Sequence, residues 1–376
     1  MGIKTKIVLA AAAACMIAGP MAIFAEETTT PTTQTTLPSP QSVKNGWNEL
    51  SDGSWCYYDS GEFVKNDWEK VGNYWYLFDE DGIMQTGLAT DPNGDQYVLA
   101  DSGEMLGGWQ EVEDTWYHAD TSSGIVDTSK WIKSGSTWYY VEKDGKMVAG
   151  QSDEIAGETY FFDESGAMLT GWVKAEGNYY YCNASGEMVT SSWVKSSGKW
   201  YYMDKDGVMQ TGWINDTYYC DESGAMVTGW SHADSEDDAW YYFNGSGEKT
   251  TGWQKVSGKW YYMDEDGVMQ TDWQTIDGKE YYLNESGAMV TGWQYLNKQM
   301  TAHTGGAGWF YFNASGELQT SKWIGGKYYV ANNGIMVTNV YVHDGSWYYW
   351  VGSDGAYVSK WDTQTEPTDG DIFETK

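Results

Sequence analysis

The 376-residue chain contains 23 Trp, 30 Tyr and 45 Gly, far more aromatic and turn-forming residues than ordinary globular proteins carry. Its Lys and Arg residues total 22 and its Asp and Glu residues total 54, which gives a formal net charge of -32. A negative charge of this size repels nucleic-acid phosphates and anionic membranes, so both are excluded as expected partners.

The first 25 residues have the parts of a secretory signal peptide. Lys4 and Lys6 form a basic start, an apolar stretch runs from Ile7 to Ala18, and Ala25 offers a small residue at the cleavage position. We therefore expect export, cleavage and a mature chain without a membrane span. Residues 26–45 are rich in Thr and Pro and are expected to form a disordered tether.

A block of about 20 residues repeats along the rest of the chain. SGKWYYMD occurs at 197–204 and again at 257–264, and GAMVTGW occurs at 224–230 and again at 287–293. A fixed short period of this kind is the signature of a repeat protein. Each repeat is marked by a Trp that follows a Gly-containing turn, and degenerate copies at Leu88, Gln151 and Val340 complete the series. The markers are Trp47, Trp68, Trp109, Trp131, Trp172, Trp193, Trp213, Trp230, Trp253, Trp273, Trp293, Trp323 and Trp361.

Each repeat predicts a β-hairpin followed by a loop. In the repeat that starts at Trp193, two extended runs flank a Ser-Gly turn at 197–198, and an Asp-x-Asp-Gly turn follows at 204–207. Alternation along residues 199–203 makes both faces of the hairpin apolar. A lone hairpin is marginally stable in water, so neighbours must cover these faces. The prediction is an all-β solenoid of about 15 stacked β-hairpin repeats over residues 46–361.

Intervals between markers range from 20 to 23 residues, except for two of 17 and one of 30. Residues 231–239 and 294–308 are therefore expected to be inserted loops that protrude from the repeats. Residues 362–376 form an acidic tail after the last marker. No stretch of about 100 residues is left for an independent catalytic domain.

The remaining polar residues predict neither catalysis nor a metal site. Cys56, Cys182 and Cys220 lie beside Tyr residues without CxxC or Cys/His spacing, and we expect them to be packing residues. Carboxylates such as Asp204 and Asp206 recur at the same turn of many repeats, so they are expected to form turns and not an acid/base pair. We expect no enzyme activity and no cofactor, and leave weak surface binding of calcium open. The four His residues are scattered, at His118, His232, His303 and His343.

These repeats resemble the cell-wall-binding, or choline-binding, repeats of Gram-positive surface proteins. The shared pattern GWxxxxGxWYYxxxxGxMxTGW covers nearly all of the chain after residue 45. Glucan-binding repeats of extracellular glucosyltransferases and the carbohydrate-binding repeats of large clostridial toxins share much of it. A single YYxxxxG would mean little, but sixteen copies with Trp, Tyr, Gly and Met in step make the resemblance specific.

The resemblance implies that a ligand lies between consecutive hairpins. It would be held by the marker Trp, the Trp of the WYY segment and an aromatic residue of the next repeat, with Met nearby. Rings arranged in this way attract quaternary ammonium ions such as choline. The two Trp stand seven residues apart at Trp68 and Trp75, Trp109 and Trp116, Trp131 and Trp138, Trp193 and Trp200, and Trp253 and Trp260. In the same order the third ring is assigned to Tyr97, to Tyr140 with Tyr139 as the alternative, to Tyr160, to Tyr219 with Tyr218 as the alternative, and to Tyr282 with Tyr281 as the alternative.

Some repeats depart from this pattern. Where the WYY Trp is replaced, we expect an incomplete cage. All of these aromatic residues can also serve in packing between repeats, and packing is the favoured role of Met209, Met226, Met269 and Met289. The replacements are Thr159, Tyr179, Thr217, Glu280 and Lys327.

The sequence therefore predicts a secreted protein of the bacterial cell surface that binds a cell-wall polymer without a covalent bond. Choline on teichoic acid is the first candidate ligand. The alternative is a glycan-binding adhesin whose Trp and Tyr rings stack on the sugars of a glucan. A murein hydrolase is the third class considered, and the catalytic residues it needs are not visible. The oligomeric state is left open.

Overall fold

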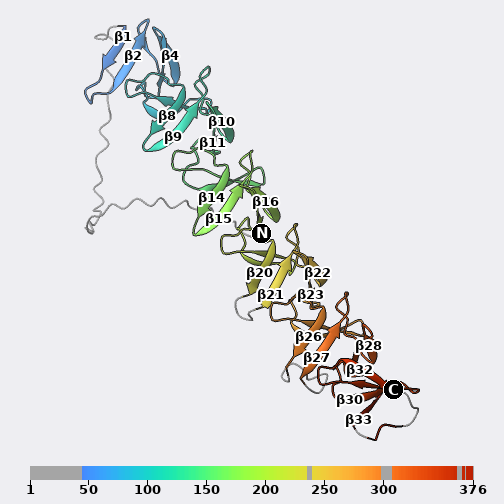
Figure 1. Cartoon of the computed structure of the whole chain (residues 1–376). Coiled ribbons are helices and arrows are strands. Elements are labelled where there is room, and N and C mark those ends of the chain that lie inside the picture. The colour runs from blue at the N-terminus through green and yellow to red at the C-terminus, as the bar shows by residue number, and fades with distance from the viewer. Residues whose placement is uncertain (1–44, 235–238, 298–306, 362–365, 369, 376) are drawn as a thin grey trace, which may run out of the picture. The chain divides into compact units, whose positions relative to one another are not determined.

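The computed structural model describes residues 45–234, 239–297, 307–361, 366–368 and 370–375. Within these ranges the chain is all-β, with strands β1 to β33 (Figure 1). A search of the same residues finds no helix long and apolar enough to cross a membrane. The predicted signal peptide, residues 1–25, and residues 26–44 of the predicted tether lie outside the described residues.

The chain divides into two compact units, which are described separately. One comprises Met1–Val194 with Met203–Met209, and the other comprises Lys195–Tyr202 with Gln210–Lys376. Strands β16 (Ser192–Ser196) and β17 (Lys199–Met203) contain residues of both units.

The first unit contains seven antiparallel hairpins, and the first hairpin carries a third strand. The strands are β1 (Gly46–Glu49), β2 (Trp55–Asp59), β3 (Glu62–Phe63), β4 (Asp67–Val71), β5 (Tyr74–Phe78), β6 (Gly87–Thr90), β7 (Gln96–Leu99), β8 (Gly108–Val112), β9 (Thr115–Ala119), β10 (Lys130–Ser134), β11 (Thr137–Val141), β12 (Ser152–Ile155), β13 (Glu158–Phe161), β14 (Gly171–Ala175) and β15 (Asn178–Cys182).

The second unit also contains seven hairpins, and the last belongs to a four-stranded sheet of order β32-β31-β30-β33. Its strands are β18 (Gly212–Ile214), β19 (Tyr218–Cys220), β20 (Gly229–Asp234), β21 (Ala239–Phe243), β22 (Gly252–Val256), β23 (Lys259–Met263), β24 (Asp272–Ile276), β25 (Lys279–Leu283), β26 (Gly292–Leu296), β27 (Gly308–Phe312), β28 (Lys322–Ile324), β29 (Tyr328–Val330), β30 (Val340–His343), β31 (Tyr348–Val351), β32 (Tyr357–Trp361) and β33 (Asp371–Glu374).

Turn chemistry fixes the register of the hairpins. Pairing of β22 with β23 leaves Ser257 and Gly258 as a two-residue turn, and both have positive φ, 50° and 84°. This is the geometry of the type I′ turn, whose twist matches that of the strands. The predicted Ser197-Gly198 turn has the same conformation, with φ of 48° and 82°.

A buried residue lies at the end of the second strand of each hairpin, or directly beside that end, and forms the core. Val141, Phe162 and Cys182 are at most 1 % exposed, and each forms a bridge to the residue six positions later in the following loop. Cys56 and Cys220 are also buried, and all three cysteines are free thiols, as predicted. Burial raises the pKa of Cys182 to about 12, so it stays a neutral thiol that behaves as a small hydrophobic residue.

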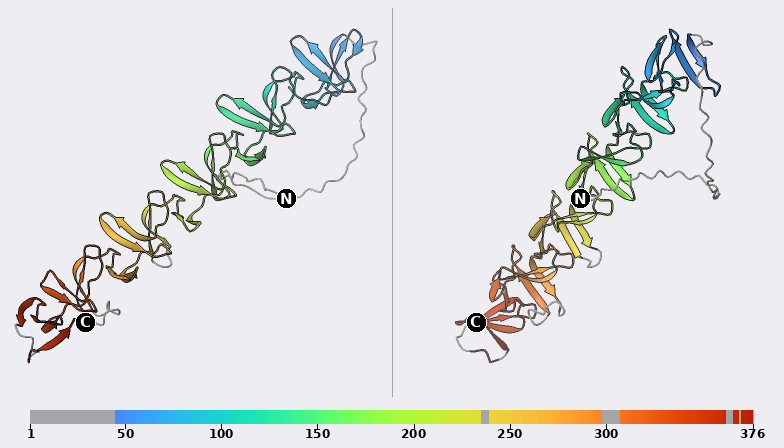
Figure 2. Two further views of the ribbon diagram at one scale, coloured as in Figure 1. Left: turned by 90° about the vertical axis from the view of Figure 1, so that its right-hand side faces the viewer. Right: turned by 180° about the vertical axis from the view of Figure 1, so that it is seen from behind.

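Successive hairpins within a unit stack through the loop between them. The N–H of Met168, which follows β13, donates to the carbonyl of Trp138 in the preceding hairpin (2.8 Å). The Met168 side chain then covers Gly186 of the next loop, where an added Cβ would lie 2.4 Å from its Sδ. Each unit is thus a solenoid in which a hairpin contacts its chain neighbours, as two further views show (Figure 2).

The register corrects several details of the predicted repeat boundaries. Two degenerate markers lie one residue later than predicted, at Ser152 and Tyr341, because the buried residues Phe162 and Val351 fix where the strands pair. Trp361 starts no new hairpin and instead ends β32, which pairs with β31. The acidic segment includes β33, which pairs in parallel with β30 and was not predicted.

The predicted inserts contribute more to strands than expected. Residues 231–234 extend β20 and residues 294–296 complete β26, so the first inserted loop is shorter than predicted and the second begins later. Residues 235–238 and 298–306, on which the prediction of protruding loops rests, lie outside the described residues.

Candidate functional site

The cleft after hairpin β10–β11 is the most complete candidate site. The rings of Trp131 and Trp138 stand at 90° with centroids 6.4 Å apart, and Tyr160 from β13 lies 4.9 Å from Trp131. Met168 and Ser185 join these three rings around a cavity of about 250 Å³. Three consecutive repeats therefore supply the walls of one cleft.

Strand register explains why these rings meet. In hairpin β10–β11, Trp131 pairs with Tyr140 and Lys133 pairs with Trp138, so all four side chains lie on one face. Tyr160 occupies the same position in β13 as Tyr139 occupies in β11. This position comes one residue before the one that pairs with the marker, so its side chain lies on the opposite face of the hairpin. That opposite face turns toward the preceding hairpin, which brings Tyr160 to Trp131.

The same three-ring corner recurs in other repeats. Its two Trp rings are again 6.4 Å apart and nearly perpendicular, and the Tyr of the next hairpin lies 4.7 to 4.9 Å from the first Trp. Two of these corners escaped the sequence prediction because a longer turn separates their Trp residues by eight and ten positions instead of seven. The recurring corners are Trp47, Trp55 and Tyr76; Trp230, Trp240 and Tyr261; and Trp253, Trp260 and Tyr281.

The other predicted clefts are partly assembled. Trp68 lies 4.6 Å from Tyr97 as predicted, and its companion Trp75 is 41 % exposed. Trp109 lies 5.3 Å from Tyr139 and 5.0 Å from His118. Its companion Trp116 is similarly exposed.

The fourth predicted pair, Trp193 and Trp200, falls where the chain divides. Trp193 belongs to the first unit and Trp200 to the second, so each is described within its own unit. Trp193 is half-buried on β16, and Trp200 is exposed on β17.

At two clefts the register decides for the alternative third ring. The ring that contacts Trp109 is Tyr139 and not Tyr140, and the ring that contacts Trp253 is Tyr281 and not Tyr282. Tyr140, Tyr219 and Tyr282 instead pair across the hairpin with the marker Trp of their own repeats. The residue that reaches back is the preceding one in the strand, because adjacent side chains point to opposite faces.

A lysine accompanies several of the exposed outer rings. Lys133 Nζ lies 5.3 Å from the centroid of Trp138, and the equivalent lysine holds a similar position at Trp75, Trp200 and Trp260. Trp138 remains 39 % exposed beside this lysine. The outer ring is thus held in place by a cation–π contact and still presents surface to solvent.

The repeats without an outer Trp differ among themselves. At β28–β29 the missing ring is restored from the last sheet, because Tyr357 lies 6.1 Å from Trp323 and 6.2 Å from Tyr349. Trp323 and Tyr349 are 5.6 Å apart, so three rings again surround one space. No seven-residue spacing could reveal this corner, since Tyr357 takes the place of a Met.

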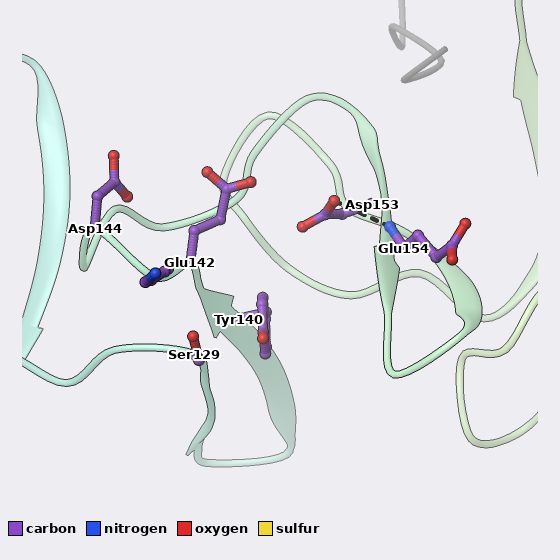
Figure 3. A pocket seen from close by; sticks show the side chains of 7 residues that line it. Ser129, Tyr140, Glu142, Asp144, Asp153 and Glu154 are labelled. Carbon is purple, nitrogen blue, oxygen red and sulfur yellow. Dashed lines mark hydrogen bonds between the residues drawn. The ribbon is translucent and has the colours of Figure 1, made fainter. Parts of the chain in front are cut away.

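A second hollow lies beside Tyr140 and is acidic (Figure 3). Glu142 and Asp144 from the loop after β11 border it on one side, and Asp153 and Glu154 of β12 border it on the other. Its volume is about 420 Å³. Within the described residues no group of three His, Cys, Asp or Glu is placed to hold a metal ion.

The recurrent carboxylates serve as turn acceptors, as predicted. Asp204 Oδ1 accepts the backbone N–H of Asp206 and of Val208, both at 2.9 Å. Asn183 makes the same two bonds, to Ser185 and Glu187, with its amide oxygen. The neutral Asn side chain therefore accepts the same hydrogen bonds as Asp, so the turn requires a hydrogen-bond acceptor and not a negative charge.

Three sequence profiles of choline-binding or cell wall binding repeats match most of the described repeats. Profiles of the choline-binding repeat match residues 66–107, 150–193 and 271–323, and a related choline-binding profile matches 317–357. A profile of a cell wall binding repeat matches residues 107–122, 129–147, 191–209, 233–249 and 251–269.

Known proteins share both the sequence and the fold. CbpJ from Streptococcus pneumoniae is 28% identical, and the likeness covers 67% of this chain and 100% of CbpJ with a TM-score of 0.50. Glucosyltransferase-S from Streptococcus downei is 30% identical over 138 residues, and that from Streptococcus mutans is 29% identical over 116 residues. These matches span 35% and 30% of this chain but only 10% and 8% of the two glucosyltransferases.

Proposed function

Because the chain belongs to the family of choline-binding and cell wall binding repeats, we propose that it attaches non-covalently to a cell-wall polymer that displays quaternary ammonium groups, such as choline on teichoic acid. The corner of Trp131, Trp138 and Tyr160 with its cavity carries this proposal. Its ring faces and edges surround a space closed by Met168, and ring faces attract an alkylated cation that cannot donate hydrogen bonds.

Repetition fits a weak individual site. Each ring contributes about 0.5 to 2 kcal/mol to binding of a cation, and association costs several kcal/mol, so one cleft reaches about millimolar affinity. Several clefts that face a polymer with many identical groups gain by effective concentration, and avidity can exceed single-site affinity by about 10² to 10⁴. The proposed activity is therefore multivalent adhesion at the cell surface, after export directed by residues 1–25.

A glycan-binding function is the second candidate. It is favoured by the matches to glucosyltransferases, which lie within the repeats of this chain. Sugar binding needs polar groups beside the stacking ring, and the cavity at Trp131 offers two hydroxyl groups, those of Ser185 and Tyr160, among ring and Met surfaces. This composition favours the ammonium ligand. We further propose that the chain is a binding protein and not an enzyme.

Titration of the purified protein tests the proposed function. Intrinsic Trp fluorescence and thermal melting are followed with choline chloride, tetramethylammonium chloride and a glucan oligomer. Saturable millimolar quenching and a rising melting temperature with both ammonium salts are expected. Absence of any response to the ammonium salts, with a response to the glucan, would replace the first candidate by the second.

Matched variants locate the binding. Trp138→Ala and Trp260→Ala remove outer rings that are 39 % exposed, so binding should weaken by about tenfold at each altered cleft with little loss of stability. Tyr74→Ala removes a ring that is 56 % exposed but belongs to none of the three-ring corners. Equal loss of binding in Tyr74→Ala would show that the corners are not the sites.

A further inference from the structure

Hairpin β18–β19 is shorter than its neighbours, and the shortening removes one wall of its cleft. It pairs three residues per strand, whereas β22–β23 pairs five. Hairpin β18–β19 lacks the two pairs nearest the turn, which in β22–β23 are Lys255 with Trp260 and Val256 with Lys259. Asn215 and Asp216 form the turn directly after Ile214, and Thr217 occupies the place of the outer Trp. The 17-residue interval from Trp213 to Trp230 reflects a loss of three residues relative to the 20-residue interval from Trp253 to Trp273.

The residue that normally closes a cleft is also replaced here. Lys249 N–H donates to the carbonyl of Thr217 (2.7 Å), just as Met289 N–H donates to that of Trp260 (2.7 Å). The Lys249 stem covers Gly267, where an added Cβ would lie 2.7 Å from its Cδ. Lys249 is therefore the equivalent of the closing Met, with the same backbone bond and the same glycine beneath its side chain.

The Lys249 ammonium lies against the marker ring of this cleft. Its Nζ is 5.0 Å from the centroid of Trp213, and Tyr241 of the next hairpin lies 5.1 Å from the same ring. Lys249 is half-buried, whereas every other lysine in the described ranges is exposed. Among the described residues no carboxylate lies within ion-pairing distance of Nζ, so the rings are its partner.

We propose that Lys249 is an internal ligand of the Trp213 cleft. Its ammonium takes the place at which the other clefts bind a cation, so this cleft is closed to external ligands. This step rests on the proposed function only in treating the other clefts as binding sites.

The other shortened hairpin shows that closure is a property of the residue and not of hairpin length. At β28–β29 the equivalent of the closing Met is Tyr357, whose N–H donates to the carbonyl of Lys327 (2.7 Å). Tyr357 adds a ring beside Trp323, 6.1 Å away, and brings no cation. One short repeat is thus filled by its own chain, and the other is rebuilt as a three-ring corner.

Indole N–H resonances of the full chain, labelled with ¹⁵N-tryptophan, test the proposal. The Trp213 resonance is assigned from the Trp213→Phe variant, and tetramethylammonium chloride is the probe. In the unaltered protein the resonances of Trp131 and Trp253 should shift saturably while that of Trp213 stays fixed. In Lys249→Met, which restores the closing residue of the neighbouring repeats, Trp213 should shift saturably as well. A Trp213 shift of equal midpoint in the unaltered protein overturns the proposal.

The reciprocal change guards against a variant that fails to fold. Met289 closes the cleft of Trp253 and Trp260, and Met289→Lys should place an ammonium there as Lys249 does at Trp213. Binding at Trp253 should weaken by at least about tenfold, while Trp131 keeps its midpoint. Unchanged binding at Trp253, in a variant that keeps its other resonances, overturns the proposal.

The outcome also separates this proposal from the proposed function. If the clefts of the unaltered protein respond to a glucan oligomer and to no ammonium salt, the ammonium ligand of the proposed function fails. Closure of the Trp213 cleft by Lys249 is then tested by adding the same glucan oligomer and following the Trp213 resonance. A Trp213 response gained in Lys249→Met supports closure, and a response already present in the unaltered protein overturns it.

Discussion

At the scale of single residues, the acidic side chains are explained by turns. Asp221 Oδ1 accepts the N–H groups of Ser223 (2.8 Å) and Ala225 (3.0 Å). Partial burial raises the pKa of Asp221, but the hydrogen bonds from Ser223 and Ala225 lower it by more, and the net pKa is below its usual range. The carboxylate therefore stabilises the fold above the unfolded pKa, and this stabilisation is lost as pH falls through the folded pKa.

Substitution of Asp221 separates acceptor from charge. Asp221→Asn keeps the acceptor and should leave the urea midpoint at neutral pH nearly unchanged, whereas Asp221→Ala should cost about 1 to 2 kcal/mol. The Asn variant should also lose less stability than the parent between neutral and acidic pH, because its turn no longer titrates. If Asn proves as damaging as Ala, the charge itself holds the turn.

At the scale of elements, the solenoid depends on a contact between Met and Gly of consecutive loops. Gly186 has a φ of 88° and lies under Met168, and Gly166 has a φ of 80° and lies under Met147. Turn glycines inside hairpins, such as Gly177 with a φ of 84°, have nothing within 4 Å of an added Cβ. The two kinds of glycine share a backbone conformation and differ only in the neighbour above them.

This difference gives a matched pair of variants. Gly177→Ala should cost about 1 kcal/mol from its positive φ alone, whereas Gly186→Ala adds a clash with Met168 and should cost about 1 to 3 kcal/mol more. Urea unfolding measures both. Gly186→Ala combined with Met168→Ala should recover part of the loss, and equal costs for the two single variants would contradict the role of the contact.

The sequence allowed the hairpins, their turns and the stacking to be predicted, because repetition made the pattern of Trp, Tyr, Gly and Met visible. It also located Trp131, Trp138 and Tyr160 correctly with respect to one another. Where two adjacent Tyr residues compete, as Tyr139 and Tyr140 do, the sequence left both open as the third ring, since only the register decides which one faces backward.

The seven-residue spacing between Trp residues failed to locate the remaining clefts for a different reason. Trp230 and Trp240 are ten positions apart, because extra residues between them lengthen the chain without changing the distance between the two rings across the hairpin. Tyr357 reaches its cleft from another sheet strand, and Lys249 from the place of a Met. The sequence alone cannot show that these residues replace the closing Met, because their equivalence is revealed only by the backbone hydrogen bond that each makes to the preceding hairpin.

At the scale of the whole molecule, the negative charge of the chain strengthens binding of a positively charged ligand and weakens binding of a negatively charged one. The chain has a net charge of -32, so a free ammonium ion is attracted to it. A wall polymer whose backbone contains phosphates is repelled as a whole, even while its ammonium groups are bound. Adhesion to such a polymer, as proposed, would be the balance of many short-range contacts against this long-range repulsion.

Salt should therefore act in opposite directions on the two ligands. Raising NaCl from about 0.01 to about 0.1 M shortens the Debye length from about 30 to about 10 Å. Binding of tetramethylammonium should weaken, and retention of the protein on teichoic-acid-bearing cell walls should strengthen. Calorimetry and a wall-pelleting assay measure the two effects. Weakening of both would mean that attraction, and not repulsion, governs the encounter with the wall.

Because Trp131, Tyr160 and Ser185 belong to three successive repeats, a cleft is not the property of any one of them. A fragment cut at a repeat boundary keeps every hairpin it contains and yet leaves the clefts nearest the cut without their far walls. Shortening the chain should thus remove binding capacity faster than it removes folded mass. A minimal engineered tag would need about three consecutive repeats for its first working site, and one repeat more for each site after that.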